Sequence, residues 1–485
     1  MTGRIIKWLV IALAALHLVA LGWVVKNYFQ YSLVKDSAED IGARIAYQIS
    51  NGFSGYATNS VQYDMLNYTP LYYTVQAQAI RWVGLDIRVQ RFVALFFGIG
   101  CILLIAAIVK LRTQSFFWAY LAAAFFAGIN LPAWYIELNA NLPCFFFAAL
   151  ALFGLMRDPT LSWKTCIWVT VSLFCSFWSK QTGLAFLAAG LFYILLNHRP
   201  KFIVCLLLAG SLIGCGIAYY TIIREAPFIF NVFGFLSMEP ILWNRLLDPV
   251  LFPQITGRLG AVTALFVAGL LCTTKRWQEL LKPEYIFLGA SAVSGVYASL
   301  KYGSGLTHHV LFYGLLIACA LSLVEPMMKR GMVQPVLVYT LLVLQATAEI
   351  TDIRPCLIND ADQDRYNKIQ DLLATPGKRT QYYSHGYQSI LVGKPAICVG
   401  LMEPEDYYLR HRISYHPDFI KLWESDPFDL FLINVPLEAN SQLAASYLNR
   451  DFNLIGDWPE LPANGWDLRK RLLIFERKGK QEVQP

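Results

Sequence analysis

The stretch from Lys35 to Gly52 holds the densest group of acidic residues near the start of the chain, directly after its first apolar segment. If the stretch is helical, Asp36, Glu39 and Asp40 share one face, because residues three and four apart are neighbours on a helix. Like charges this close either repel or hold a cation, and one carboxyl can thereby be tuned to accept a proton. Asp36 and Glu39 also have the spacing of a capping box, so a purely structural part in the first helical turn stays open.

The segments that must position this stretch are strongly apolar. Of 485 residues, 56% are hydrophobic and 15% charged, and the mean hydropathy is +0.44, which excludes an ordinary soluble domain. The first apolar run follows Arg4 and Lys7 and is not followed by a small-residue cleavage site, so we expect a retained span rather than a signal peptide. We expect a polytopic α-helical membrane protein with about eleven transmembrane helices, at about 7–28, 91–109, 115–130, 142–156, 164–179, 182–197, 202–222, 259–274, 285–300, 309–324 and 334–350.

Basic residues fall in alternate breaks between these runs, on the same side as Arg4 and Lys7. The positive-inside rule therefore places the N-terminus in the cytoplasm, with the loop 29–90 and the tail 351–485 on the other side. These anchors account for most of the net charge of +7. We therefore expect the lipid bilayer, and no nucleic acid, as a partner.

Two domains are expected, a transmembrane domain over 1–350 and an extracytoplasmic soluble α/β domain over 351–485. In the tail, the pattern predicts a helix from Asp364 to Ala374 and strands at about 380–384, 396–400, 428–434, 453–455 and 472–476. Cys356 and Cys398 both lie there, where an oxidising compartment permits a disulfide, and the sequence leaves their pairing open. The outer loop 224–258 is either a flap over a lipid donor or a simple surface helix pair.

Ordered motifs surround the acidic stretch. Asn51-Gly52 is expected to end its helix, Asn67-Tyr68-Thr69-Pro70-Leu71-Tyr72-Tyr73 follows, and Thr74 to Gly84 has the pattern of an amphipathic interfacial helix. Two further motifs stand beside later spans, Phe177 to Gly183 (FWSKQTG) and Lys301 to His309 (KYGSGLTHH). Long outer loops of this kind usually carry function.

With the second span that opens on Arg91-Phe-Val-Ala-Leu, these motifs resemble the GT-C superfamily of membrane glycosyltransferases over residues 1 to about 325. The likeness is closest to bacterial enzymes that use polyprenyl-phosphate sugars, related to protein mannosyltransferases and the lipid A aminoarabinose transferase. It implies a protein of the bacterial inner membrane with a periplasmic C-terminal domain. The implied reaction is inverting transfer of a sugar from a polyprenyl-phosphate donor to an extracytoplasmic glycan, lipid or protein acceptor.

This chemistry assigns parts to particular residues. A carboxylate general base is expected at Asp36 or Glu39; family members often carry adjacent Asp-Glu, whereas this chain has Asp36-Ser37-Ala38-Glu39-Asp40, and Asp36 is favoured. The donor phosphate is expected to meet Lys180, Lys301, Arg91, Arg258 and His308. Substrate contacts are expected from Asp40, Tyr68, Tyr72 and Glu137.

Other interpretations remain. Asp36 and Glu39 could hold a divalent cation, Mg or Mn, whereas His308 and His309 lack a third ligand at suitable spacing. Basic and aromatic residues at span ends also serve as headgroup anchors. A transporter, or a glycan ligase or polymerase with a diphosphate-linked donor, are the alternative functions; transporters usually place ionisable sites near the bilayer midplane, where these spans carry almost none.

Overall fold

The computed structural model describes residues 2–34, 37–56, 66–129, 140–234, 237, 241–244, 259–273, 277–301, 306–348, 357–378, 380–382, 429–435, 452–458 and 471–478. Asp36, Glu137, Arg258, Cys356 and Cys398 lie outside these ranges, as do the strand expected at 396–400 and most of the loop 224–258.

Each of the eleven apolar runs coincides with a helix. These helices are α1 (Thr2–Gln30), α4 (Ile87–Thr113), α5 (Phe116–Ile129), α6 (Asn141–Arg157), α7 (Trp163–Ser179), α8 (Gly183–Asn197), α9 (Arg199–Ala218), α12 (Gly260–Thr273), α13 (Pro283–Ser299), α14 (Val310–Lys329) and α15 (Pro335–Ala348). In the described part of the chain, four are both long and apolar enough to cross a membrane: α1, α4, α14, and α9 with its extension to Ile223. Five more are apolar but shorter.

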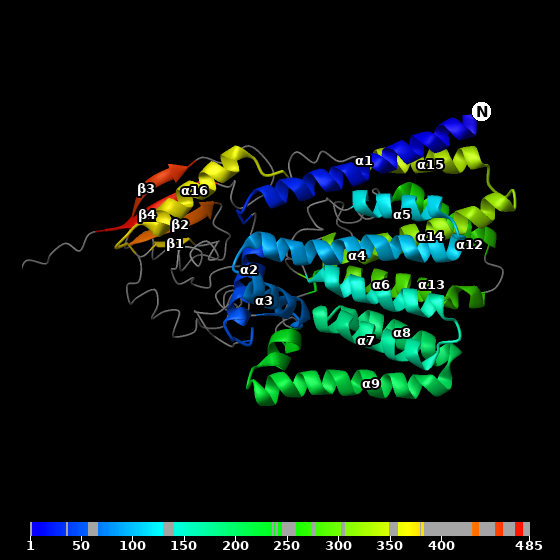
Figure 1. Ribbon diagram of the computed structural model, residues 1–485, viewed down its shortest axis with the longest axis horizontal. Helices are drawn as coiled ribbons and strands as arrows, with labels where there is room; N and C mark the ends of the chain where they lie inside the picture. The colour runs from blue at the N-terminus through cyan, green and yellow to red at the C-terminus, as the bar shows by residue number, and fades with distance from the viewer. Residues whose placement is uncertain are drawn as a thin grey trace, which may run out of the picture.

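The long helices lie side by side as an elongated bundle, with α1 and α15 along one edge and α9 along the other (Figure 1). Two shorter helices, α2 (Ser37–Ser50) and α3 (Leu71–Val83), lie at the end of the bundle where α1 ends and α4 begins. Short π and 3-10 turns occupy several connections: η2 (Tyr219–Ile223), η3 (Phe230–Gly234), η5 (Trp277–Leu281) and η6 (Leu306–His309).

Helix ends follow local sequence signals. Asp86 caps α4 by accepting a hydrogen bond from the Arg88 backbone N–H at 2.8 Å, and Ser162 caps α7 through the Thr165 N–H. Helix α2 ends at Ser50, and Gly52 then adopts φ +94°, a conformation that costs glycine little. The predicted stop at Asn51-Gly52 is confirmed.

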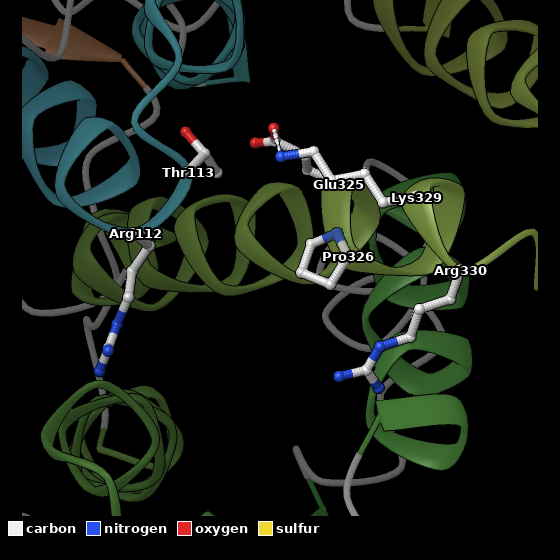
Figure 2. A pocket seen from close by; sticks show the side chains of 6 residues that line it. All are labelled: Arg112, Thr113, Glu325, Pro326, Lys329 and Arg330. Atoms are coloured by element: carbon white, nitrogen blue, oxygen red, sulfur yellow. Dashed lines mark ion pairs between the residues drawn. The ribbon is translucent and has the colours of Figure 1, made fainter.

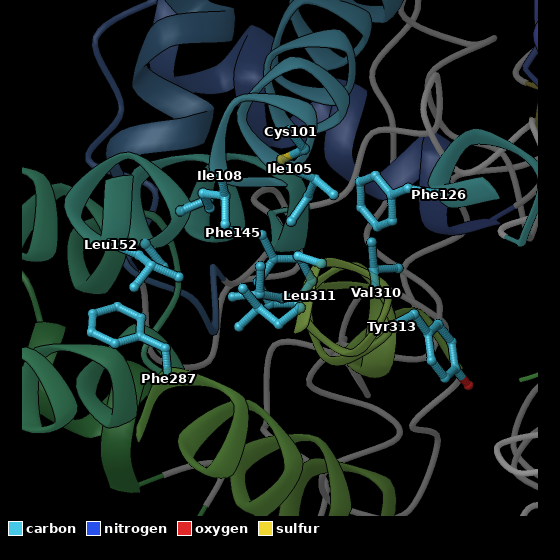
Figure 3. Packing of buried hydrophobic residues seen from close by; sticks show 14 of the residues in the cluster. Cys101, Ile105, Ile108, Phe126, Phe145, Leu152, Phe287, Val310, Leu311 and Tyr313 are labelled. Atoms are coloured by element: carbon cyan, nitrogen blue, oxygen red, sulfur yellow. The ribbon is translucent and has the colours of Figure 1, made fainter. Parts of the chain in front are cut away.

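Apolar side chains from α4, α5, α6, α13 and α14 meet in the bundle core (Figure 3), which also includes buried residues of α1, α7, α8, α12 and α15. Ile105 of α4, Phe145 of α6 and Leu311 of α14 are almost fully buried, and α14 is the most buried of the candidate spans. Helix α14 therefore runs through the interior of the bundle, whereas α9 is mostly exposed and suits a lipid-facing position.

The tail forms a small sheet and a helix at the same end of the molecule as α2 (Figure 1). Its elements are α16 (Asp360–Ala374), β1 (Thr380–Tyr382), β2 (Leu430–Val435), β3 (Phe452–Trp458) and β4 (Arg471–Arg477), in the sheet order β1-β2-β4-β3. Strand β1 pairs parallel with β2, and the other pairs are antiparallel, with Leu432 opposite Ile474. The described strands overlap four of the five predicted ones.

The tail is joined to the first long helix by packing and by hydrogen bonds. Tyr28 of α1 packs in one buried cluster with Ile369 of α16 and Leu432 of β2. The Asn27 side chain donates to the Ile358 carbonyl at 2.8 Å and accepts from the Ile358 N–H at 2.8 Å. The end of α1 and the tail therefore share one apolar core.

Candidate functional site

The acidic helix α2 is fixed to the start of α4 by a buried ion pair. Arg91 donates to both carboxylate oxygens of Glu39, from Nε to Oε1 at 2.7 Å and from Nη2 to Oε2 at 2.8 Å. Both side chains are almost fully buried. This two-point geometry is the strongest form of arginine–carboxylate pairing.

The remaining Arg91 donors bind backbone carbonyls at the end of α1. Nη1 donates to Tyr28 at 2.8 Å and Tyr31 at 3.0 Å, and Nη2 donates to Leu33 at 2.7 Å. A guanidinium has five N–H groups, and all five are thus used inside the protein. The structure places Arg91 in the interior, and none of its donors is left for the donor phosphate that the sequence suggested.

The other carboxylate of α2 is also paired. Asp40 Oδ2 lies 2.8 Å from Arg44 Nε, one helical turn further along, and both side chains are buried. With two acidic residues in its first turn, α2 has the charge arrangement that stabilises a helix N-terminus. Glu39 and Asp40 are therefore both held by arginines, and Asp36 lies outside the described residues.

Two of the sequence motifs meet at the junction between α7 and α8. The Thr69 hydroxyl donates to the Phe177 carbonyl at 2.7 Å, and Gln181 Nε2 donates to the Asn67 carbonyl at 2.8 Å. These hydrogen bonds join segments more than one hundred residues apart. The NYTPLYY segment is therefore seated directly on the FWSKQTG segment.

Lys180 lies at this junction, with polar groups from three other parts of the chain around its ammonium. Nζ donates to Asn141 Oδ1 at 2.8 Å, lies 3.5 Å from His308 Nδ1 and stands 4.7 Å from the centre of the Tyr68 ring. Lys180 is only 4% exposed, and no carboxylate among the described residues forms an ion pair with it. Such a buried cation is a candidate partner for an anionic ligand.

Burial sets the charges of this group. Desolvation lowers the pKa of Lys180 to about 8, so its ammonium is still largely charged at neutral pH. Desolvation, and then the Lys180 charge, lower the pKa of His308 well below its usual value, and burial raises the pKa of Tyr68 to about 12. At pH 7 the cluster is therefore a single cation beside a neutral imidazole and a neutral phenol.

Two neighbouring amides have buried atoms without hydrogen-bond partners. Both polar side-chain atoms of Asn67 and Oε1 of Gln181 are buried and make no hydrogen bond within the described structure. Each of these residues is adjacent in sequence to a member of the cluster, Asn67 to Tyr68 and Gln181 to Lys180. Unpaired buried amides need a partner from water or from a ligand.

Two other predicted site residues, Tyr72 and Lys301, have surroundings of their own. Tyr72 is fully buried, with its ring 6.3 Å from that of Phe97 in an edge-to-face contact. Lys301 Nζ lies 5.5 Å from the Tyr297 ring, and its backbone pairs with Ile241. Among the described residues, no group of three His, Cys, Asp or Glu side chains has the arrangement of a metal site.

Asn141 is the contact that sequence reasoning missed. It opens an apolar helix, where a polar residue reads as an ordinary helix start. The available signal was its place four residues after Glu137 in the sequence, where the fourth apolar run begins. From the sequence, Asn67 was named only as part of a motif. The structure shows that its side-chain amide is buried next to Tyr68 and makes no hydrogen bond within the described residues.

Comparison with solved structures identifies the fold. The sequence matches no protein-family model and no curated protein. The structure is similar to ArnT from Cupriavidus metallidurans in the apo state, with TM-score 0.56, 13% identity, and coverage of 94% of this chain and 96% of that one. ArnT bound to undecaprenyl phosphate gives TM-score 0.54 and 14% identity, covering 96% and 97%.

An archaeal protein shows the same likeness. The Archaeoglobus fulgidus oligosaccharyltransferase in the apo form gives TM-score 0.50 and 12% identity, over 93% of this chain and 74% of that one. At such low identity the likeness establishes the fold, which extends over nearly the whole chain.

Proposed function

We propose that this protein transfers a sugar from a polyprenyl-phosphate donor to an acceptor outside the cytoplasm. The proposal starts from its fold, which is the GT-C fold of membrane glycosyltransferases. The observation that carries the proposal is the buried Lys180 ammonium, which lies where its own segment meets three other parts of the chain. Undecaprenyl phosphate, named as the ligand of one ArnT structure, has the headgroup chemistry that such a cation would bind.

The donor phosphate is assigned to Lys180, with His308 beside it. Lys180 supplies the charge, Asn141 and the Tyr68 ring hold its side chain in place, and the neutral His308 ring can donate a hydrogen bond to the phosphate. A fixed cation stabilises the phosphate as it departs with the bonding electrons, which lowers the barrier to transfer. Lys301 and Arg258 remain secondary candidates for the same headgroup.

The base is assigned to Asp36. Glu39 is held at both oxygens by Arg91, and Asp40 is paired with Arg44, so each of these two carboxylates already has a structural part. Asp36 directly precedes α2, and removal of a proton from the acceptor hydroxyl by its carboxylate would generate the nucleophile that attacks C1 of the sugar. Attack opposite to the leaving phosphate inverts the configuration at C1.

The sugar is assigned to the amide atoms of Asn67 and Gln181 that lack hydrogen-bond partners beside the phosphate position. Asn67 and the free oxygen of Gln181 offer both donors and acceptors, which suits hydroxyl groups. Tyr68 presents a ring close by, and sugars commonly lie against such rings. Glu137 stays a candidate acceptor or donor contact.

The membrane arrangement is part of the proposal. In this arrangement the eleven helices that coincide with the apolar runs span the bilayer, the N-terminus is cytoplasmic, and α2, α3 and the C-terminal sheet lie on the periplasmic side of a bacterial inner membrane. The C-terminal α/β domain, which packs on the end of α1, would then lie at the mouth of the site, where it can help to bind the acceptor.

Binding and transfer can be measured with purified protein in nanodiscs. Wild type should bind undecaprenyl phosphate and release it from a polyprenyl-phosphate sugar in the presence of cell-envelope acceptors. Lys180→Met should lose binding, whereas Lys164→Met, a basic residue outside the cluster, should not. Equal binding by both variants, or activity only with a polyprenyl-diphosphate sugar, would contradict the assignment.

A further inference from the structure

The turn η6, which carries His308, is seated on the last turns of α13. Ser299 Oγ shares a hydrogen bond of 2.7 Å with Nε2 of His309, the last residue of η6, and both side chains are almost fully buried. Gly295 lies one helical turn earlier on α13. A Cβ added there would stand 2.7 Å from His309 Nδ1 and 3.3 Å from the His308 carbonyl oxygen. Residues four apart share a helix face, so one face of α13 both binds η6 and leaves room for it.

This seat fixes how the His308 ring meets Lys180. His308 Nδ1 lies 3.5 Å from Lys180 Nζ. An ammonium has hydrogens to donate and no lone pair to accept with, so Nδ1 is the acceptor and the neutral ring carries its hydrogen on Nε2. The Nε2–H group is therefore the one that can donate to a phosphate held by Lys180. A shift of η6 by roughly 1 Å is enough to spoil such a geometry.

We propose that Ser299 and Gly295 are positioning residues for the transfer reaction, which hold η6 so that the His308 Nε2–H group faces the donor phosphate. This role rests on the proposed function, in which His308 lies beside that phosphate. Neither residue touches the substrate, and each acts through η6. A hydrogen bond from His308 strengthens as negative charge develops on the departing phosphate, so its misalignment lowers kcat more than it raises the KM for the donor.

The other end of α13 is anchored by a separate contact. Arg112 Nη2 pairs with Oε1 of Glu284 in the first turn of α13 at 2.5 Å. Arg112 also lines a cavity of about 260 Å³ at the bundle end opposite α2 and α3 (Figures 1 and 2). Glu284 and Ser299 are roughly 22 Å apart along the helix, at about 1.5 Å per residue. Arg112→Gln therefore loosens the start of α13 without touching η6.

Two matched controls lie on α13 itself. Ser291 is buried like Ser299, but its hydroxyl donates to the Leu288 carbonyl of its own helix at 2.7 Å. Gly289 is a helix glycine like Gly295, but an added Cβ there would meet no other part of the protein within 4 Å. Each control makes the same chemical change on the same helix and leaves the seat of η6 intact.

Steady-state transfer by Ser299→Ala and Gly295→Ala tests the proposal. Each should lower kcat by about tenfold, because one donor to the developing charge is misaligned and not removed, while the KM for the donor stays nearly constant. Ser299→Thr, which keeps the hydroxyl, should recover most of the loss. Ser291→Ala and Gly289→Ala should keep the wild-type kcat, and so should Arg112→Gln. An equal loss in any of these three controls would overturn the proposal.

A double variant shows whether Ser299 acts through His308. In a His308→Ala background, Ser299→Ala should cost nothing further, because the ring that it positions is gone. A purely structural role of Ser299 would lower kcat by the same factor in both backgrounds. Losses that multiply in this way would contradict the positioning role.

The nitrogen NMR spectrum of histidine-labelled protein gives a readout that does not depend on turnover. The His308 signals are identified by their loss in His308→Gln, and wild type should show the Nε2–H form. Ser299→Ala and Gly295→Ala should shift these signals or mix the two ring forms, whereas Ser291→Ala should not. Unchanged signals in both variants would overturn the positioning role even if no sugar were transferred. Failure of the proposed function would appear separately, as binding of undecaprenyl phosphate that Lys180→Met leaves intact.

Discussion

Replacing Arg91 by methionine should destabilise the protein strongly, because one buried guanidinium serves five acceptors. The substitution leaves the Glu39 carboxylate without its partner and removes the donor from the Tyr28, Tyr31 and Leu33 carbonyls. Methionine fills much of the same space, so the change tests hydrogen bonding and charge more than packing.

The size of the loss in unfolding free energy follows from the burial of Arg91 and its partners. Removing one partner of a buried ion pair costs about 3–5 kcal/mol, because the other charge stays desolvated, and each orphaned buried carbonyl adds about 1–3 kcal/mol where water cannot reach it. Arg88 provides the control. It lies one turn away and pairs with Asp86, but its side chain is 46% exposed, and an exposed pair is worth only about 0–1 kcal/mol.

The assay is unfolding of purified protein in one detergent, for wild type, Arg91→Met, Arg88→Met and the double variant Arg91→Met/Glu39→Leu. Arg91→Met should lose several kcal/mol of unfolding free energy and Arg88→Met little. The double variant should be more stable than Arg91→Met alone, because it no longer buries an unpaired charge. Equal losses in Arg91→Met and Arg88→Met would refute the structural part given to Arg91.

Three further results are expected. Binding of undecaprenyl phosphate should weaken as pH rises above about 8, because deprotonation removes the Lys180 charge, whereas Lys180→Arg should bind equally at pH 7 and 9; a flat wild-type profile would contradict this. Asn27→Leu should increase protease cleavage after Ile358, since both hydrogen bonds between them are lost; Gln30→Leu is the control. Exhaustive chelation should leave lipid phosphate binding unchanged, because Lys180 supplies the charge; loss of binding would point to a metal.

Local patterns predicted the helices and strands well. Apolar runs bounded by basic residues gave eleven helices close to those observed, and Asn51-Gly52 marked the end of α2 because glycine accepts the required positive φ. The four described strands overlap predicted β-rich runs in the tail. These features depend on residues near one another in sequence, so periodicity and turn chemistry are sufficient to find them.

The partners within the site could not be predicted in the same way. Arg91 reads as a basic residue at the outer end of a span, suited to a phosphate, yet it is buried against Glu39, which lies 52 residues earlier. Lys180 was expected at the donor phosphate from its place in the FWSKQTG motif, but its contact with Asn141 depends on how α6 and α7 pack. Such pairings are set by tertiary packing, which leaves no local signal.

The place of the donor phosphate can be seen in a structure of the protein with polyprenyl phosphate bound. The lipid phosphate is expected within hydrogen-bonding distance of Lys180 Nζ and beside the His308 ring, with Asn67 and Gln181 facing the space where the sugar would attach. A phosphate bound elsewhere, with Lys180 still enclosed by Asn141 and Tyr68 and touching no ligand, would contradict it.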